Sequence, residues 1–237
     1  MIRQTIAFTL AETLIVMGII GVVSALTLPN LNASTGEKEK VAKVKKIYQN
    51  LEDALGRAKV VYGPIEEWYR LDSNIDDRSK RFGERITEFM KVSKTCGVST
   101  GCFSTAPLKY AKGTTWVEND VQALISSKAY MYILNDGTSL AFDLTYSKIR
   151  IDIDGPTKGK NQNGVDRFTI KLCDGGLSLT GCLSGYDDIL FSGNTVSGLA
   201  SGSSSEEYSM RWVIMNDNMD YLKCANKLNW ETKTSCK

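Results

Sequence analysis

The sequence predicts an α+β protein in which a long helical amino-terminal part precedes an antiparallel sheet. Three patterns predict this order: an apolar run over residues 8–28, a helical stripe over residues 41–61, and alternating strands over residues 129–172. The chain has 237 residues, which suggests one domain plus an extension, or two small domains. A core of ordinary size is therefore expected outside the apolar run.

The run from Phe8 to Leu28 reaches the length of about 20 residues that spans a bilayer. Glu12 is the one charged residue within it. A charged side chain at the bilayer centre costs on the order of 3 kcal/mol, so an acid in this position indicates a function. If the leader MIRQTIA is removed before Phe8, the new α-amine lies four residues before Glu12 and is mostly protonated at neutral pH. Glu12 then has a candidate positive partner.

This arrangement resembles the amino terminus of type IV pilins and type II secretion pseudopilins. In that family a short basic leader is cut before a Phe, which is then N-methylated; the resemblance places the cut between Ala7 and Phe8. Ala7 stands where the family usually has Gly. The resemblance implies that Glu12 pairs with the terminal amine of a neighbouring subunit during assembly. Pro29 matches a proline that interrupts the helix of the family after the apolar run.

The resemblance implies a pilin-like fold, in which one long helix has a membrane half and an amphipathic half that packs on the sheet. It divides the chain into a leader (1–7), this helix (8–62) and a periplasmic or extracellular globular domain (63–237). The implied function is that of a structural subunit of a type IV pilus-like or pseudopilus filament. Such a subunit resides in the inner membrane before assembly. The implied partners are other pilin subunits, a prepilin peptidase, an inner-membrane assembly platform and the membrane.

Two other interpretations of the apolar run stay open. A secretory signal peptide also combines a charged start, an apolar core and a small-residue cleavage site, here Val23-Ser24-Ala25. A plain transmembrane anchor requires only the length of the run. Either would make the chain an exported or anchored binding domain that does not polymerise. The acid at Glu12 and the amphipathic helix that follows favour the pilin interpretation.

The composition argues against catalysis and against nucleic-acid binding. The chain has no His, which removes the commonest general base and the usual zinc ligand. The sequence also has no Gly-rich phosphate loop and no nucleophile elbow. With 29 basic and 27 acidic residues, the net charge is only +2, so the overall charge gives no sign of a nucleic-acid partner, and a local basic patch stays open. We expect a protein that is not an enzyme.

Six cysteines fall into three close pairs along the chain, and none forms a CxxC motif. Export favours their oxidation, and free buried thiols in an intracellular protein are the alternative. Six cysteines allow 15 connectivities. We predict the sequential one: Cys96 with Cys102, Cys173 with Cys182, and Cys224 with Cys236.

Local patterns predict the elements that follow the apolar run. Apolar residues recur at helical spacing before Gly63-Pro64, at Val41, Val44, Ile47, Leu51, Leu55, Ala58 and Val61. Short helices are expected within residues 82–89 and 119–127. Strands are expected over residues 129–134, 139–144, 149–153 and 168–172, with Asp136-Gly137 as a hairpin turn. A surface loop is expected over residues 192–205, and a last short strand around Trp212.

A cluster of oxygen-bearing side chains lies between the third and fourth of these strands. Such groups around glycines suit Ca²⁺, which takes six to eight oxygen ligands, and some pseudopilins bind calcium in a loop near the sheet. The spacing does not match an EF-hand. The alternative is a turn-rich loop, where Asp, Asn and Gly are expected on backbone grounds. Calcium is the one cofactor that the sequence suggests, with Asp152, Asp154, Asn161, Asn163 and Asp166 as its candidate ligands.

Overall fold

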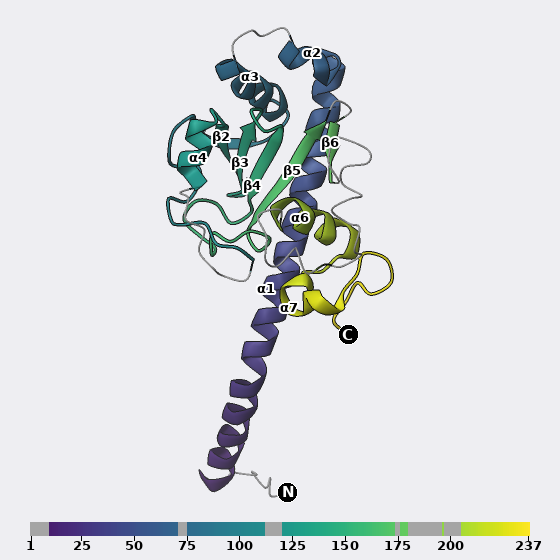
Figure 1. The fold of residues 1–237 in the computed structure, drawn as a ribbon. Coiled ribbons are helices and arrows are strands. Elements are labelled where there is room, and N and C mark those ends of the chain that lie inside the picture. Colours follow the sequence, from purple (N-terminus) through teal and green to yellow (C-terminus); the bar gives the residue numbers. More distant parts are fainter. Residues whose placement is uncertain (1–9, 71–74, 112–119, 174–175, 180–195, 197–204) are drawn as a thin grey trace, which may run out of the picture. The chain divides into compact units, whose positions relative to one another are not determined.

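A computed structural model describes residues 10–70, 75–111, 120–173, 176–179, 196 and 205–237, without the side chains of residues 26–34, 69–70, 75–76, 120 and 205–207. It combines helices with an antiparallel sheet, which confirms the predicted α+β class (Figure 1). Two compact units can be distinguished, residues 1–39 and residues 40–237.

Helix α1 is assigned from Leu10 to Tyr62. It ends at the predicted place, where Gly63 takes a φ of 79° and its N–H donates to the carbonyl oxygen of Lys59 at 3.0 Å. The helix continues across Pro29, where the sequence predicted a break. A proline in a helix interior removes one hydrogen bond and kinks the helix, but neighbouring turns can keep the helix going.

The predicted membrane span falls in the first part of α1. Within the described residues, no helix combines the length and the apolar character that a bilayer crossing requires. Phe8 and the side chains of residues 26–28, which belong to the predicted run, lie outside the described residues. The span over residues 8–28 stays a prediction.

The described part of the sheet has six strands in sequential order, and every neighbouring pair is antiparallel. Its four inner strands match the predicted meander, whereas the two edge strands were not predicted. The exposed edge strand β1 lacks alternating apolar residues, and β6 has only three residues. The strands are β1 (Val92–Gly97), β2 (Tyr130–Leu134), β3 (Ser139–Asp143), β4 (Lys148–Asp152), β5 (Arg167–Cys173) and β6 (Gly176–Ser178).

One face of the sheet packs against the second half of α1. The predicted stripe from Val41 to Ala58 is buried in one core cluster with Leu140, Ile151 and Phe168 from the strands. The stripe departs from prediction at its end, because Val61 is 58% exposed. Tyr62 packs against the core instead, since it lies four residues after Ala58 and thus on the same side of the helix.

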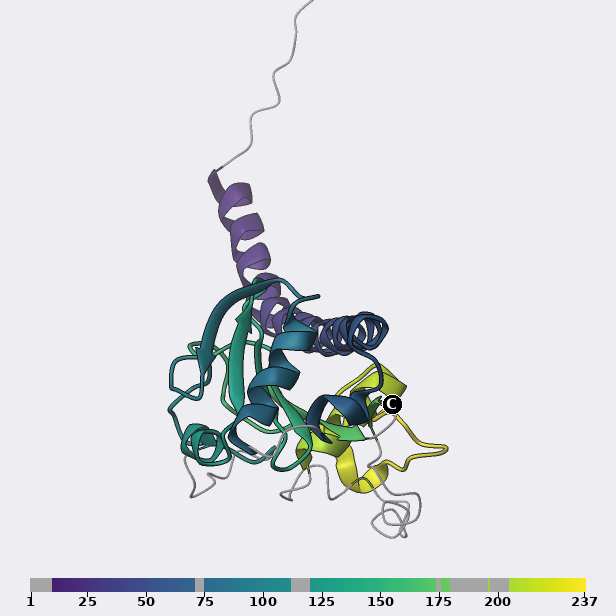
Figure 2. The same ribbon diagram turned by 90° about the horizontal axis from the view of Figure 1, so that it is seen from above.

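Short helices complete the globular unit. Helix α4 (Asp120–Ser126) covers the other face, where Val121 and Leu124 join Met131 and Ala141 in a second cluster (Figure 2). The remaining elements are α2 (Ile65–Arg70), α3 (Ile75–Thr87), α6 (Ser205–Asn216), α7 (Tyr221–Cys224) and a 3₁₀ turn (Ala225–Lys227). Helices within residues 82–89 and 119–127 were predicted.

The strand predicted around Trp212 is wrong, because this segment forms helix α6. Trp212 and Val213 have aromatic and β-branched side chains that favour strands, but packing against β5 decides the outcome. Tyr208 and Trp212, four residues apart, are both buried, as helical spacing allows. The loop predicted over residues 192–205 lies largely outside the described residues; Val196 within it is buried.

Candidate functional site

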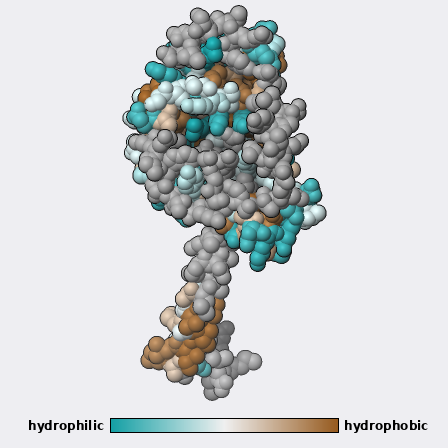
Figure 3. All heavy atoms as spheres, in the orientation of Figure 1, coloured by the Kyte–Doolittle hydropathy of each residue, from teal (hydrophilic) through white to brown (hydrophobic). Residues whose placement is uncertain are grey.

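The first part of α1 exposes apolar side chains on all its sides. Leu14, Ile15, Val16 and Met17 are four consecutive residues that cover a full helical turn, and each is more than half exposed. We call this surface the apolar segment. The exposed fraction of its large side chains lies between 53% and 83%; these residues are Leu10, Leu14, Ile15, Val16, Met17, Ile19, Ile20, Val22 and Val23. Figure 3 shows these side chains gathered in brown. A helix that is apolar all round is ordinarily buried in a protein core or a membrane.

Glu12 lies in the first turn of α1 and is exposed. A carboxylate in the first turn is favoured by the positive end of the helix dipole. Ala7 and Phe8, the predicted cleavage and methylation site, lie outside the described residues. The structure therefore places Glu12 within the apolar segment.

The described disulfides are Cys96–Cys102, with a Cα–Cα distance of 6.0 Å, and Cys224–Cys236, also at 6.0 Å. Both are pairs that the sequence predicted. Cys173 is itself disulfide-bonded, and its predicted partner Cys182 lies outside the described residues. Both described bonds close short loops, which stabilise a fold by roughly 2–3 kcal/mol each in the chain-entropy model.

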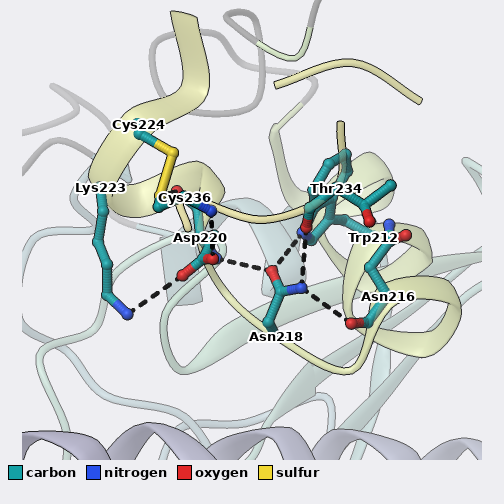
Figure 4. Close-up of polar contacts among 8 residues, drawn as sticks. All are labelled: Trp212, Asn216, Asn218, Asp220, Lys223, Cys224, Thr234 and Cys236. Carbon is teal, nitrogen blue, oxygen red and sulfur yellow. Dashed lines mark hydrogen bonds and ion pairs between the residues drawn. A yellow bond between two sulfur atoms is a disulfide. The ribbon is translucent and has the colours of Figure 1, made fainter. Parts of the chain in front are cut away.

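The carboxy-terminal disulfide is supported by polar contacts around Asn218 (Figure 4). The Asn218 amide accepts a hydrogen bond from the indole N–H of Trp212 at 2.9 Å and donates to the carbonyl oxygen of Thr234 at 3.0 Å. Asp220 accepts from the backbone N–H of Cys236 at 2.8 Å. The tail is thus held by hydrogen bonds to Asn218 and Asp220 as well as by the disulfide to Cys224 in α7.

The five predicted calcium ligands all lie at the end of β4 or in the loop that leads to β5, and the aspartate oxygens among them already accept backbone hydrogen bonds or contact lysines. Asp152 Oδ1 accepts the N–H groups of Asp154 and Gly155 at 3.1 and 2.9 Å. Asp166 accepts the N–H groups of Gln162, at 2.6 Å, and of Lys160. Backbone N–H groups therefore already use acceptor oxygens of Asp152 and Asp166.

A basic side chain that the sequence analysis overlooked lies at the centre of this loop. Arg167 is 3% exposed, and its Nη1 donates to Asn161 Oδ1 at 2.9 Å. The same nitrogen lies 3.8 Å from Asp152 Oδ2. A guanidinium that contacts the same carboxylate would repel a divalent cation bound there, which argues against calcium in this loop. Across the described residues, no three acidic, Cys or His side chains are grouped to hold a metal ion.

Asn163 is fully buried, and neither its Oδ1 nor its Nδ2 has a hydrogen-bond partner. A metal ion would satisfy only the oxygen of this amide. A water molecule both donates and accepts, so it suits the pair of atoms better. The orphaned amide therefore adds nothing to the case for calcium.

Burial raises the pKa of two aspartates at the ends of strands β3 and β4. Burial raises the pKa of Asp152 to about 7, while Arg167 opposes the shift and Asp166 adds to it. Burial also raises the pKa of Asp143 above its usual range, opposed by Arg150 and by a hydrogen bond from Ser127. Both carboxyls bind protons more readily in the folded chain than in the unfolded chain.

Lysines of α1 contact aspartates of the loops that surround it. Asp154, from the β4–β5 loop, lies 2.9 Å from Lys43 Nζ and 3.6 Å from Lys40 Nζ. Lys46 pairs in the same way with Asp136 of the β2–β3 turn at 2.8 Å. Neither set of pairs was predicted, although the excess of lysines on this part of the helix was a signal. These contacts join the polar loops to α1.

Comparison with protein-family models, with curated proteins and with solved structures gave no match. Similarity therefore assigns no family to this chain. The apolar segment is the most distinctive surface among the described residues, because large apolar side chains are exposed on all sides of one helix. The function is best inferred from the environment that would cover the apolar segment.

Proposed function

We propose that this chain is a structural subunit of a filament of the type IV pilus or type II secretion pseudopilus kind, assembled through the amino-terminal part of α1. The observation that carries the proposal is the apolar segment, which is exposed on every side of the helix. Helices of this kind are covered when identical helices bundle together or when lipid surrounds them. A filament subunit needs both environments in turn.

The proposed sequence of events begins with removal of the leader after Ala7 and methylation of the Phe8 amine. The subunit waits in the inner membrane and is then drawn into the filament by an assembly platform. There Glu12 meets the Phe8 amine of the neighbouring subunit. Four residues along a helix correspond to about 6 Å, so an axial offset of that size between neighbouring helices would bring the unlike charges together. The pairing mainly offsets desolvation and sets the register of the helices.

Several features support this proposal. Glu12 is the one charged residue in the run from Phe8 to Leu28. The globular unit combines a helix buried along one stripe, an antiparallel sheet and disulfides, as an exported pilin-like domain requires. The chain contains no His, the commonest general base in catalysis. A structural role is consistent with all of these.

To test the proposal, the chain is expressed together with a prepilin peptidase and the other assembly components. Its mature amino terminus is then identified by mass spectrometry. We expect N-methylated Phe8, and filaments in the sheared fraction. Glu12→Val is expected to reduce filament recovery by at least about tenfold while the subunit stays in the membrane, since a register-setting charge pair is lost. Glu52→Val, which changes an exposed acid farther along α1, is the matched control and should assemble normally.

Three results would contradict the proposal or a part of it. An amino terminus at Leu26 would indicate cleavage after Val23-Ser24-Ala25 and hence an exported domain that lacks the apolar segment. Normal filament recovery by Glu12→Val would remove the charge pairing. An uncut, membrane-bound chain that never enters filaments would support the anchored binding domain instead.

A further inference from the structure

The guanidinium of Arg167 joins three parts of the globular unit at one buried point. It bonds Asn161 from the β4–β5 loop and lies beside Asp152 at the end of β4. Its Cζ also lies 4.6 Å from the ring centroid of Phe103, a fully buried residue next to Cys102. A guanidinium over an aromatic face gains electrostatic attraction, and more so when water is excluded.

One side of the loop is attached to the chain segment that contains Phe103. Asn161 Nδ2 donates to the carbonyl oxygen of Ala106 at 2.7 Å, and Gln162 Nε2 donates to that of Ala111 at 2.6 Å. Backbone bonds link Lys109 with residues 161 and 163 at 2.9 and 2.8 Å. This half of the loop is therefore ordered by its contacts with residues 106–111.

The other side of the loop is attached to α1. Asp152 holds the backbone N–H groups at the start of the loop, and this positions the carboxylate of Asp154 toward Lys43 and Lys40. Asp152 is 2% exposed and needs a nearby positive charge if it is to stay ionised. Arg167 supplies that charge, because a guanidinium stays protonated at any physiological pH.

We propose that Arg167 is the internal cation of the β4–β5 loop, so that the order of this loop and its attachment to α1 do not depend on a divalent ion. A loop of this Asp, Asn and Gly composition would otherwise suggest calcium. Here the positive charge is covalently part of β5 and cannot be removed by a chelator. The inference concerns residues 40–237 only and stands whether or not the chain polymerises.

The first test measures the thermal midpoint of the full chain in mild detergent, with millimolar calcium and with a chelator. We expect the two midpoints to agree within about 1 °C. A calcium site filled at one hundred times its Kd would raise the midpoint by about 5–10 °C in a chain of this size. A rise of that order in the unmodified chain would overturn the proposal.

The second test removes the guanidinium. Arg167→Met is expected to lower the midpoint by about 10 °C, because it leaves the buried Asp152 without its partner. Lys171→Met is the matched control, since Lys171 lies on the same strand and face but is only half-buried. Arg167→Lys keeps the charge and should lose clearly less than Arg167→Met, which keeps the test informative if the Met variant does not fold.

A double variant separates the charge from simple packing. If Arg167 acts as a counter-ion, Asp152→Asn combined with Arg167→Met should recover at least half of the loss caused by Arg167→Met alone. Hydrogen exchange should show faster exchange at residues 106–111 and 160–163 in Arg167→Met, and slower exchange again in the double variant. Equal losses in the single and double variants, or a loss no larger than that of Lys171→Met, would refute the counter-ion role.

Discussion

Gly155 lies against the backbone of Gly137 so closely that a Cβ on Gly155 would collide with the Gly137 carbonyl oxygen. Gly155 also has a φ of 77°, a conformation that residues with a side chain rarely adopt. The contact joins the β2–β3 turn to the β4–β5 loop. Backbone strain alone usually costs about 1–3 kcal/mol. We expect Gly155→Ala to lower the free energy of unfolding by more than this, because the collision adds to the strain. Urea denaturation measures this directly.

Gly56 provides the matched control for that substitution. It is exposed in the middle of α1, and no atom lies near the position of an added Cβ. Gly56→Ala is expected to raise the free energy of unfolding by about 0.5–1 kcal/mol, because alanine loses less backbone entropy on folding. Equal effects of the two variants would mean that the close approach of Gly155 to Gly137 is not present in solution.

The buried stripe of α1 is the second point to test. Leu51 is fully buried on the side of α1 that packs against the sheet, whereas Val61, ten residues later, is 58% exposed. Leu51→Ala is expected to lower the free energy of unfolding by about 2–5 kcal/mol through loss of packing and creation of a cavity. Val61→Ala should stay within about 0.5 kcal/mol of the unmodified chain. A similar loss in both variants would show that the described register of α1 is wrong.

Asn218 is expected to hold the carboxy-terminal tail independently of the disulfide. Asn218→Ala removes the acceptor for the indole N–H of buried Trp212 and the donor to Thr234 (Figure 4). We expect a loss of about 1–3 kcal/mol, because a buried donor is left unsatisfied. Amide exchange at Cys236 should also accelerate. Asn226→Ala, on an exposed asparagine nearby, should change neither quantity.

The contribution of Asp152 to the free energy of unfolding should fall as the pH rises from about 4 to about 7. Because burial raises its pKa to about 7, the folded chain binds this proton in a range where the unfolded chain has released it. The free energy of unfolding therefore decreases with pH across that window and levels off above it. Asp152→Asn should flatten this part of the profile, measured by urea denaturation at successive pH values. If Asp152→Asn leaves the slope of the profile unchanged, a group other than Asp152 binds this proton.

Local patterns predicted much of the sheet. The alternation from Tyr130 to Leu134 and the Asp136-Gly137 turn specify a hairpin through short-range geometry alone. The same reasoning failed at Trp212, whose intrinsic preference for strands is outweighed by packing of helix α6 against β5. It also failed at the edge strand β1, because an exposed edge needs no apolar alternation.

Residue patterns alone predicted the apolar run with Glu12, the buried stripe of α1, the inner strands and the described cysteine pairs. These predictions rest on periodicity and spacing, which are local properties of a chain. The folded chain was needed to show that Arg167 lies among the candidate calcium ligands, that Asp154 contacts Lys43, and that α6 is a helix. Contacts between residues distant in sequence depend on how the elements pack, and a residue pattern does not encode them separately.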